Sequence, residues 1–375
     1  MSFEVKGWCP GAHRPMMSGD GFVVRVRPRL AQLSRAQALG LCAAAQAHGA
    51  GLIDLTNRAN VQVRGVGESA WPALMDDLGA LGLLDADVAT ETRRNIVTAP
   101  DWRKGDETEW LAMELTARLD ELPALPPKMG FAIDAGAAPV LPEVPSDFRI
   151  ERGVSGGLIL RADGRAAGVP LPDMREIDML IRLAWWFVQT GGAEARRMAR
   201  HTAPLPDWAA ATEPPAAPRA ALRPGAHPMG AVHGAAFGQV RAADLARAIE
   251  TSGLTALRVT PWRAVLMLDA APGPHPGLVW QADSPLLRVD ACPGAPFCPQ
   301  ASVETRTLAE ALAPRVTGAL HVSGCAKGCA RVTPAHTVLT GRAGRFDLSH
   351  ETLAGGTPAA EGLTPAQVRD HFGAA

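Results

Sequence analysis

Apolar and basic residues alternate near the start of the chain and predict a strand. Residues 22–27, with the sequence FVVRVR, show the period of two that is typical of a half-buried strand. Residues 35–48 then place apolar side chains at helical spacing, with Ser34 as a candidate N-cap and Gly49 as a stop signal. A second strand pattern runs over residues 52–66. This order predicts a strand–helix–strand unit.

A similar unit follows later in the chain. Residues 234–240 repeat the strand pattern, residues 241–252 repeat the helical one, and residues 257–268 form a long apolar run. The pairs Leu55-Thr56 and Val259-Thr260 occupy similar places in the two units. These similarities favour an internal duplication. The alternative is that any α/β protein produces two such units by chance.

The remaining segments differ in composition from these units. Residues 203–228 contain seven prolines among many alanines, which neither a helix interior nor a central strand accommodates, so we expect a linker. Residues 172–190 carry a helical pattern within a mixed region. The segment boundaries that we expect are 1–77, 78–202, 203–228, 229–285 and 286–375.

Length and composition indicate more than one domain. The chain has 375 residues, of which 47% are hydrophobic, and this is enough for packed cores. No run reaches the ~18 uncharged apolar residues of a membrane span. The first residues also lack the pattern of a secretion signal, so we expect a cytoplasmic protein. The net charge of -1 does not favour nucleic-acid binding.

Four of the six cysteines form two close pairs. Cys292 and Cys298 have five residues between them, Cys325 and Cys329 have three, and 26 residues separate the pairs. Four thiolates are the ligand set of a [4Fe-4S] cluster. Structural zinc also takes four cysteines, but its pairs are usually about two to four residues apart. Isolated core cysteines are the other alternative. The spacing favours the cluster and therefore a redox enzyme.

The other two cysteines carry weaker signals. Cys42 shares one face of the predicted helix with Ala38, Leu41 and Ala45, which predicts a buried core thiol rather than a ligand. Cys9 lies in an irregular segment, and its role stays open. A disulfide framework is not expected, because such frameworks belong mainly to small secreted domains.

The cysteine spacing and three further motifs resemble the sulfite and nitrite reductase superfamily. The motifs are residues 55–62 (LTNRANVQ), Arg94-Asn95 and Pro127-Lys128. Members of that superfamily carry a [4Fe-4S] cluster beside siroheme, and the resemblance covers most of the chain. It implies an α+β fold, in which duplicated ferredoxin-like half-domains, 1–77 and 229–285, accompany two sulfite/nitrite-reductase-like α/β domains.

The resemblance also implies roles for individual residues. The four paired cysteines would bind the cluster, and in a reductase Cys329, the fourth, would bridge it to a haem iron. The residues carried over are Arg58, Arg94 and Lys128 as catalytic groups, and Arg25, Arg27, Asn57 and Asn95 as substrate-binding groups. We expect Arg29, Arg64 and Arg93 to be solvated surface charges.

Two motifs narrow the resemblance within the superfamily. Residues 9–21 (CPGAHRPMMSGDG) and 321–329 (HVSGCAKGC) look most like the precorrin-3B synthase family. That family uses dioxygen to hydroxylate precorrin-3A at C20, with γ-lactone formation, in cobalamin (vitamin B12) biosynthesis. Gly130 agrees, because the reductases carry there a second lysine that stabilises a reacting anion. A siroheme-dependent sulfite or nitrite reductase is the alternative, and a non-catalytic scaffold is a third possibility.

The resemblance to precorrin-3B synthases implies partners and cofactors. The partners are precorrin-3A, dioxygen and an external electron donor, because no dinucleotide-binding fingerprint follows a strand. The cofactors are the [4Fe-4S] cluster and a second centre, either mononuclear iron or siroheme. His13 and His321 are the histidines to test first as iron ligands, although such histidines are more often structural. We expect the polycarboxylate substrate in the cavity where a reductase holds siroheme, clamped by basic residues.

Overall fold

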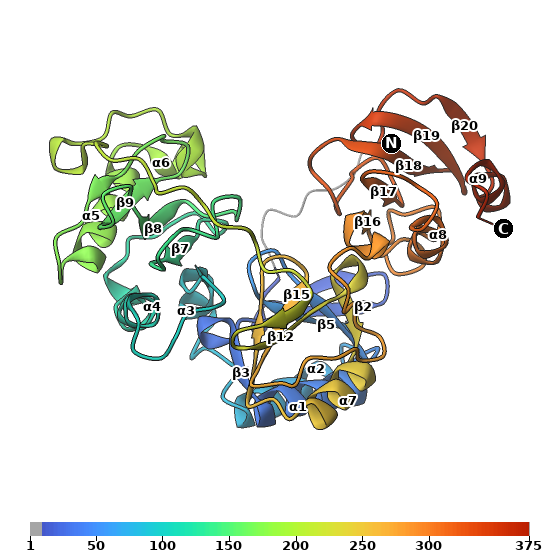
Figure 1. The fold of residues 1–375 in the computed structure, drawn as a ribbon, viewed down its shortest axis with the longest axis horizontal. Helices are drawn as coiled ribbons and strands as arrows, with labels where there is room; N and C mark the ends of the chain where they lie inside the picture. The colour runs from blue at the N-terminus through green and yellow to red at the C-terminus, as the bar shows by residue number, and fades with distance from the viewer. Residues whose placement is uncertain (1–9, 375) are drawn as a thin grey trace.

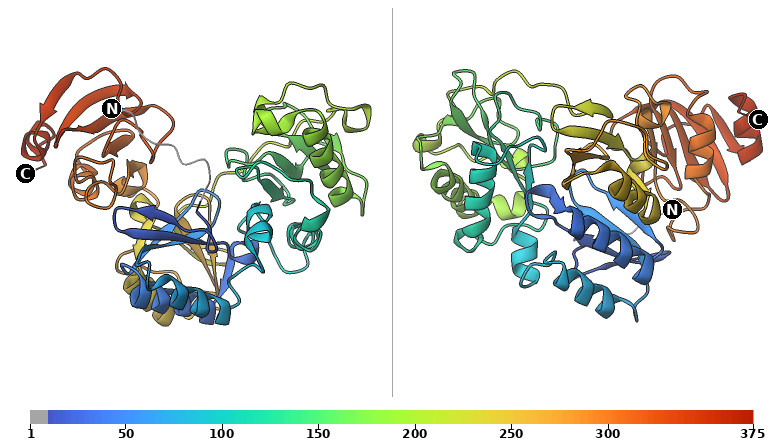
Figure 2. Two further views of the ribbon diagram at one scale, coloured as in Figure 1. Left: turned by 180° about the vertical axis from the view of Figure 1, so that it is seen from behind. Right: turned by 60° about the horizontal axis from the view of Figure 1, so that its bottom comes forward.

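The chain forms three lobes (Figure 1). The structure is a computed structural model that describes residues 10–374. A central lobe contains the two repeated units, and an outer lobe lies on either side of it (Figures 1 and 2). Each lobe has its own apolar core, and the strands form four five-stranded sheets.

The first repeated unit begins the central lobe. Its elements are β1 (Met16–Ser18), β2 (Gly21–Val26), η1 (Arg29–Ala31), β3 (Gln32–Ser34), α1 (Arg35–His48), β4 (Leu52–Leu55), β5 (Val61–Val66) and α2 (Trp71–Ala80). The helix predicted over residues 35–48 is confirmed. Ser34 and Gln37 form a capping box at its start, in which each side chain bonds the other residue's backbone N–H.

A tight turn divides the predicted strand over residues 52–66 into β4 and β5, so the prediction of one strand is wrong. The Thr56 hydroxyl accepts hydrogen bonds from the backbone N–H groups of Arg58 and Asn60 at 3.3 and 3.1 Å. Because both flanks of the turn are apolar, the hydrophobic pattern alone does not reveal it.

The second unit has the same order of elements. They are β11 (Gly225–His227), β12 (Gly230–Gly234), η5 (Ala236–Gly238), β13 (Gln239–Arg241), α7 (Ala242–Ser252), β14 (Ala256–Val259) and β15 (Ala264–Leu268). The predicted helix corresponds to α7. The predicted strand over residues 234–240 is wrong, because η5 separates the end of β12 from β13. The long run over residues 257–268 is again two strands.

Backbone geometry confirms the duplication. Leu30 and Phe237, at the same place in η1 and η5, both have positive φ, at 50° and 57°. Ala59 and Arg263 have φ of 54° and 55° in the two turns between strands. Left-handed backbone is uncommon at such residues, so its recurrence at matched positions indicates two copies of one unit rather than chance.

The two units exchange a strand. The sheet orders are β1-β2-β5-β4-β13 and β11-β12-β15-β14-β3. β13 of the second unit pairs antiparallel with β4 of the first, and β3 pairs antiparallel with β14. Helices α1 and α7 contact each other along the side of the lobe that faces away from the outer lobes (Figure 1). Side chains of both units form one apolar core.

One outer lobe, which the middle of the chain forms and which we call the middle lobe, contains a sheet of order β10-β9-β8-β7-β6. Its strands are β6 (Ile96–Thr98), β7 (Phe131–Asp134), β8 (Phe148–Arg152), β9 (Leu158–Ala162) and β10 (Val169–Pro170). Its helices are α3 (Val88–Arg93), α4 (Glu107–Ala117), η2 (Leu119–Glu121), α5 (Glu176–Gln189), α6 (Gly192–Ala195) and η3 (Met198–Arg200). The helix predicted over residues 172–190 is α5. Residues 203–228 contain only η4 (Asp207–Ala209) and β11, as their prolines predict.

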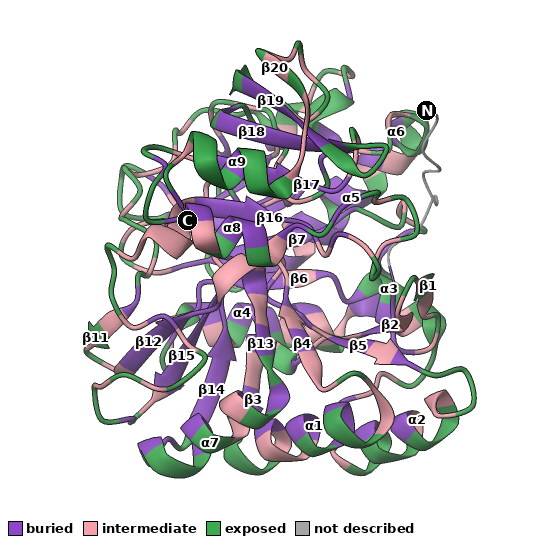
Figure 3. Cartoon of the chain, turned by 90° about the vertical axis from the view of Figure 1, so that its right-hand side faces the viewer, coloured by how far each residue is buried: buried purple, intermediate pink, exposed green. Residues whose placement is uncertain are grey.

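The C-terminal lobe carries the cysteines. Its elements are η6 (Pro285–Arg288), β16 (Val289–Ala291), α8 (Arg306–Leu312), β17 (Leu320–Ser323), β18 (Ala335–Arg342), β19 (Arg345–Thr352), β20 (Ala360–Leu363) and α9 (Pro365–His371). β16, β17 and β18 are parallel, and β19 and β20 continue the sheet antiparallel. Figure 3 shows that β16, β17 and most of β18 are buried, whereas β20 at the edge of the sheet is not. Over residues 10–374 we find no helix with the length and apolarity to cross a membrane.

The cap of α1 generates a first prediction. Ser34→Ala removes the acceptor of the Gln37 N–H and should destabilise the start of α1 by about 1 kcal/mol. Hydrogen exchange measured by mass spectrometry should accelerate in residues 35–48. Ser34→Thr keeps an acceptor oxygen and is the control. Equal exchange in the two variants would contradict the role of the cap.

Candidate functional site

A cavity of about 390 Å³ brings together segments that are far apart in the sequence. Its walls come from β4 and β5, from the turn at residues 261–263, and from the segments that carry Cys292 and Cys329. Asn57, one of the predicted substrate-binding residues, also lines it. We call this space the cysteine cavity.

The two cysteine loops follow neighbouring parallel strands. β16 ends at Ala291 beside Cys292, and β17 ends at Ser323, two residues before Cys325. Parallel strands end at the same edge of a sheet, so both loops meet there. Cys292 is buried, and the Gly324 N–H donates a hydrogen bond to its Sγ at 3.1 Å. A backbone donor of this kind stabilises a negatively charged sulfur.

The other three thiols act electrostatically on Cys329. Burial raises the pKa of Cys329, Lys327 lowers it, and the charges of Cys292, Cys325 and Cys298 raise it again. Nevertheless, within residues 10–374 no three His, Cys, Asp or Glu side chains lie close enough together to hold a metal ion. The thiols therefore influence one another electrostatically, but the described residues do not form a closed set of metal ligands. The donor set, four thiols with a backbone N–H on one sulfur, fits an iron–sulfur cluster.

A row of polar side chains crosses four strands of the first sheet. Arg25 lies opposite Gln62, Gln62 opposite Asp54, and Asp54 opposite Gln239. The Arg25 guanidinium donates to Gln62 Oε1 at 3.1 and 2.7 Å, and Gln239 Nε2 donates to Asp54 Oδ1 at 2.7 Å. Asp54 and Gln62 line the cysteine cavity. We call these four residues the polar row.

Arg64 is buried, so the prediction that it is a solvated surface charge is wrong. Only 6% of it is exposed. Its Nη2 lies 2.8 Å from Asp20 Oδ1, and its Nε lies 3.7 Å from Asp54 Oδ2. Burial raises the pKa of Asp54, whereas the charges of Arg306 and Arg64 and the hydrogen bond from Gln239 lower it. The sequence pattern indicated a group of basic residues, but it did not reveal that the Asp54 carboxylate lies near Arg64.

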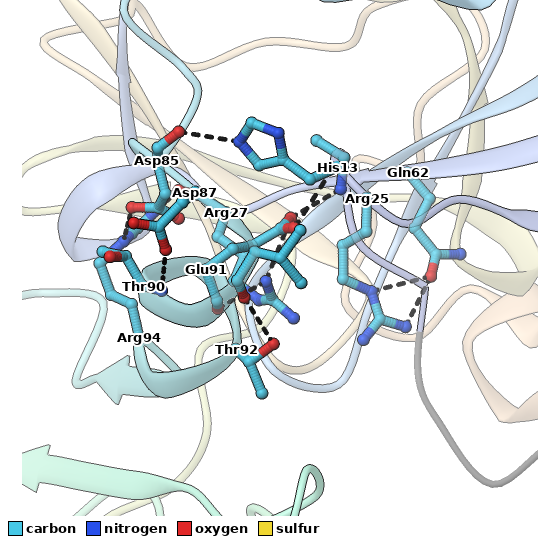
Figure 4. A network of polar contacts seen from close by, with 12 residues as sticks. His13, Arg25, Arg27, Gln62, Asp85, Asp87, Thr90, Glu91, Thr92 and Arg94 are labelled. Carbon is cyan, nitrogen blue, oxygen red and sulfur yellow. Dashed lines mark hydrogen bonds and ion pairs between the residues drawn. The ribbon is translucent and has the colours of Figure 1, made fainter.

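Figure 4 shows the network that holds Arg27 and Arg94. The Arg94 guanidinium donates to both Asp85 carboxylate oxygens, at 2.7 and 2.8 Å, and to the Arg27 carbonyl at 2.8 Å. Arg27 Nη1 donates to the Glu91 carbonyl at 2.7 Å and lies 3.2 Å from its carboxylate. The Glu91 carboxylate also accepts the Ala12 N–H at 2.6 Å. Carboxylates therefore fix the position of both arginines.

Arg58, Lys128 and Asn95 lie in segments that touch. Arg58 Nη2 donates to the Lys128 carbonyl at 2.8 Å, and Asn95 Nδ2 donates to the Met129 carbonyl at 2.6 Å. The Lys128 side chain is exposed. Arg94 directly precedes Asn95, so the three predicted catalytic residues lie in neighbouring segments. Among all the predicted catalytic and substrate-binding residues, however, only Asn57 lines the cysteine cavity. Their roles stay predictions.

Gly130 packs against Asn95. A Cβ at this position would lie 3.0 Å from Asn95 Nδ2 and 3.1 Å from its carbonyl oxygen. The Gly130 N–H also donates to the buried Asp147 carboxylate at 3.1 Å. A larger residue would therefore require Asn95 to shift. Asn95 therefore packs directly against the position at which the resemblance implies a lysine in the reductases.

The two candidate histidines differ in their surroundings. His13 Nε2 bonds the Asp85 carbonyl at 2.8 Å. His321 is fully buried, burial lowers its pKa, and neither ring nitrogen has a hydrogen-bond partner among the described residues. Cys42 is buried, as predicted, and burial raises its pKa to about 12. Arg29 and Arg93 are exposed, also as predicted. Cys9 lies outside the described residues.

Comparisons with known proteins agree with this architecture. Residues 14–81 match the model of the nitrite/sulfite reductase ferredoxin-like half domain. The NirA protein of Mycobacterium tuberculosis has a similar fold, with a TM-score of 0.56 and 17% identity over 93% of this chain and 79% of that chain. The half-domain match covers the first repeated unit, and the likeness to NirA shows that the two proteins share a fold.

A curated relative identifies the family more closely. A precorrin-3B synthase from Sinorhizobium sp is 32% identical over 404 aligned positions, which cover 95% of this chain and 85% of that protein. The chain therefore belongs to the precorrin-3B synthase family.

The network around Glu91 generates a second prediction. Glu91→Ala leaves the Arg27 guanidinium and the Ala12 N–H without this carboxylate and should reduce the free energy of unfolding by about 3 kcal/mol. Urea denaturation at neutral pH measures the change. Glu68→Ala is the control, because Glu68 is exposed. A loss no larger than that of the control would contradict the bracing role of Glu91.

The packing of Gly130 generates a third prediction. Gly130→Lys should displace Asn95 from Met129 and reduce the free energy of unfolding by about 1–3 kcal/mol, as overpacking does. Thermal denaturation measures this effect. Gly273→Lys is the matched control, because a Cβ there would meet nothing within 4 Å. If both variants were equally stable, the space around Gly130 would not explain the missing lysine.

Proposed function

We propose that this protein catalyses the precorrin-3B synthase reaction. In this reaction dioxygen hydroxylates precorrin-3A at C20, and the ring A acetate closes a γ-lactone, during cobalamin biosynthesis. Family membership supports the substrate class. The cysteine cavity is the observation that carries the proposal, because thiols and basic side chains line one space.

The lining of the cavity suits a polycarboxylate macrocycle. Precorrins carry acetate and propionate groups around the ring, and guanidinium groups bind carboxylates through two parallel hydrogen bonds. Arg64, Arg263 and Arg306 line the cavity, together with Gln62 and Asn57. We propose that the substrate occupies this space, which corresponds to the siroheme cavity of a reductase. Arg25, through Gln62, would fix the floor beneath it.

The redox chemistry requires electrons from outside the chain. Hydroxylation by dioxygen consumes two electrons and two protons and releases one oxygen atom as water. We propose that the four cysteines of the C-terminal lobe hold a [4Fe-4S] cluster, which would transfer electrons singly from a ferredoxin or a reductase. A second centre, mononuclear iron or siroheme, would supply the oxygen chemistry. His321 is a better candidate than His13 for a ligand of this second centre, because its ring nitrogens have no hydrogen-bond partner among residues 10–374.

The predicted basic residues outside the cavity lining would also position the substrate. Arg58 and Lys128 come from segments joined by a hydrogen bond, so movement of one displaces the other. Asp85 holds Arg94, and Arg94 in turn holds the Arg27 carbonyl. We propose that Arg58 and Lys128 contact the reacting macrocycle, with Asn95 fixing the Lys128–Met129 segment, and that Arg94 acts on Arg27 as a brace.

An isotope experiment tests the proposed function. Anaerobically purified protein, reconstituted with iron and sulfide and reduced with dithionite, is mixed with precorrin-3A and ¹⁸O₂. The product should carry one ¹⁸O at C20 by mass spectrometry. Cys329→Ser should abolish product formation, whereas Cys42→Ala, which changes a core thiol, should retain it. An unlabelled or unchanged tetrapyrrole would contradict the proposal. Haem absorption bands and consumption of sulfite or nitrite would instead indicate a siroheme reductase.

A further inference from the structure

Arg306 differs from the other arginines of the cysteine cavity in its lack of an ion-pair partner among the described residues. It is the first residue of α8, and it lines the cavity together with Cys292 and Asp54. Its Nε atom is buried and has no hydrogen-bond partner among the described residues. None of the ion pairs found within residues 10–374 includes it. Its charge is therefore not neutralised by a direct contact.

Both negative and positive groups influence the pKa of Arg306. Burial lowers its pKa, Asp54 and Cys292 raise it, and Arg64 and Arg263 lower it. Arg306 thus shares one cavity with a carboxylate of the first unit and a thiol of the C-terminal lobe. In a buried setting these interactions are stronger than in water, because the local dielectric constant is lower.

The other two arginines of the cavity are already paired. Arg64 contacts Asp20 at 2.8 Å, and Arg263 forms an ion pair with Asp290. The carboxylate partner of a paired cation offsets part of its field, whereas an unpaired cation keeps its whole field. Among the cavity arginines, Arg306 is therefore the one that can act on the charge of the cysteine loops.

We propose that Arg306 raises the reduction potential of the cluster bound by Cys292 and its partner cysteines, and that Asp54 moderates this effect. The inference rests on the cluster assignment of the proposed function. A cluster gains negative charge when it accepts an electron, so a nearby cation stabilises the reduced form. Asp54 partly cancels that cation. The polar row, through Gln239, holds Asp54 in place.

Opposite shifts of potential test the inference. Reconstituted Arg306→Met should have a cluster midpoint potential below that of the unchanged protein, and Arg306→Lys should stay near it. Asp54→Asn should raise the potential, because it removes the anion and keeps a similar shape. Electron paramagnetic resonance during an anaerobic redox titration measures all three. Arg315→Met is the control, because Arg315 is an exposed arginine of the same lobe outside the cavity.

Iron and acid-labile sulfide, measured per chain, separate the two ways in which the inference fails. Loaded variants with unchanged potentials, or with shifts in the same direction for Arg306→Met and Asp54→Asn, would overturn the role of Arg306 alone. Unchanged protein that takes up no iron and sulfide would overturn both this inference and the cluster assignment. Opposite shifts in fully loaded variants would establish the inference.

Discussion

The exchange of one strand between the two repeated units is the constraint on which the rest of the structure depends. β13 completes the first sheet and β3 completes the second, so neither sheet has its full complement of backbone hydrogen bonds without the other unit. The exchange also sets Gln239 beside Asp54 and finishes the polar row. The floor of the cysteine cavity is therefore a product of the duplication as a whole, and neither copy contains it alone.

The two copies have diverged at this row. In the second sheet, the positions that match Arg25, Gln62 and Asp54 are Val232, Leu266 and Arg258, as the strand registers show. The guanidinium of Arg258 donates to the carbonyls of residues 100 and 102 and lies 3.5 Å from the centroid of the Trp102 ring, so the middle lobe covers it. One face thus became an interface between lobes, while its counterpart stayed polar and opens onto the cysteine cavity.

Buried ion pairs position the segments around the cavity. Breaking such a pair costs far more than its net contribution to stability, so a pair fixes geometry more than it adds to stability. Arg64 with Asp20 and Arg27 with Glu91 join segments that are distant in sequence, whereas Arg94 pairs with Asp85 nine residues away. Arg306 stands outside this pattern, because none of the ion pairs within residues 10–374 includes it.

The sequence by itself determined the features that depend on neighbours along the chain. The cap at Ser34, the repeated pattern of the units and the spacing of the cysteines are local, and they led to the helix, the duplication and the family. Pairing across strands depends on residues far apart in sequence, and periodicity carries no information about it. Only the tertiary structure decided that Arg64 is buried and that Asp54 and Arg306 line one cavity, because the strand exchange and the meeting of two lobes place them.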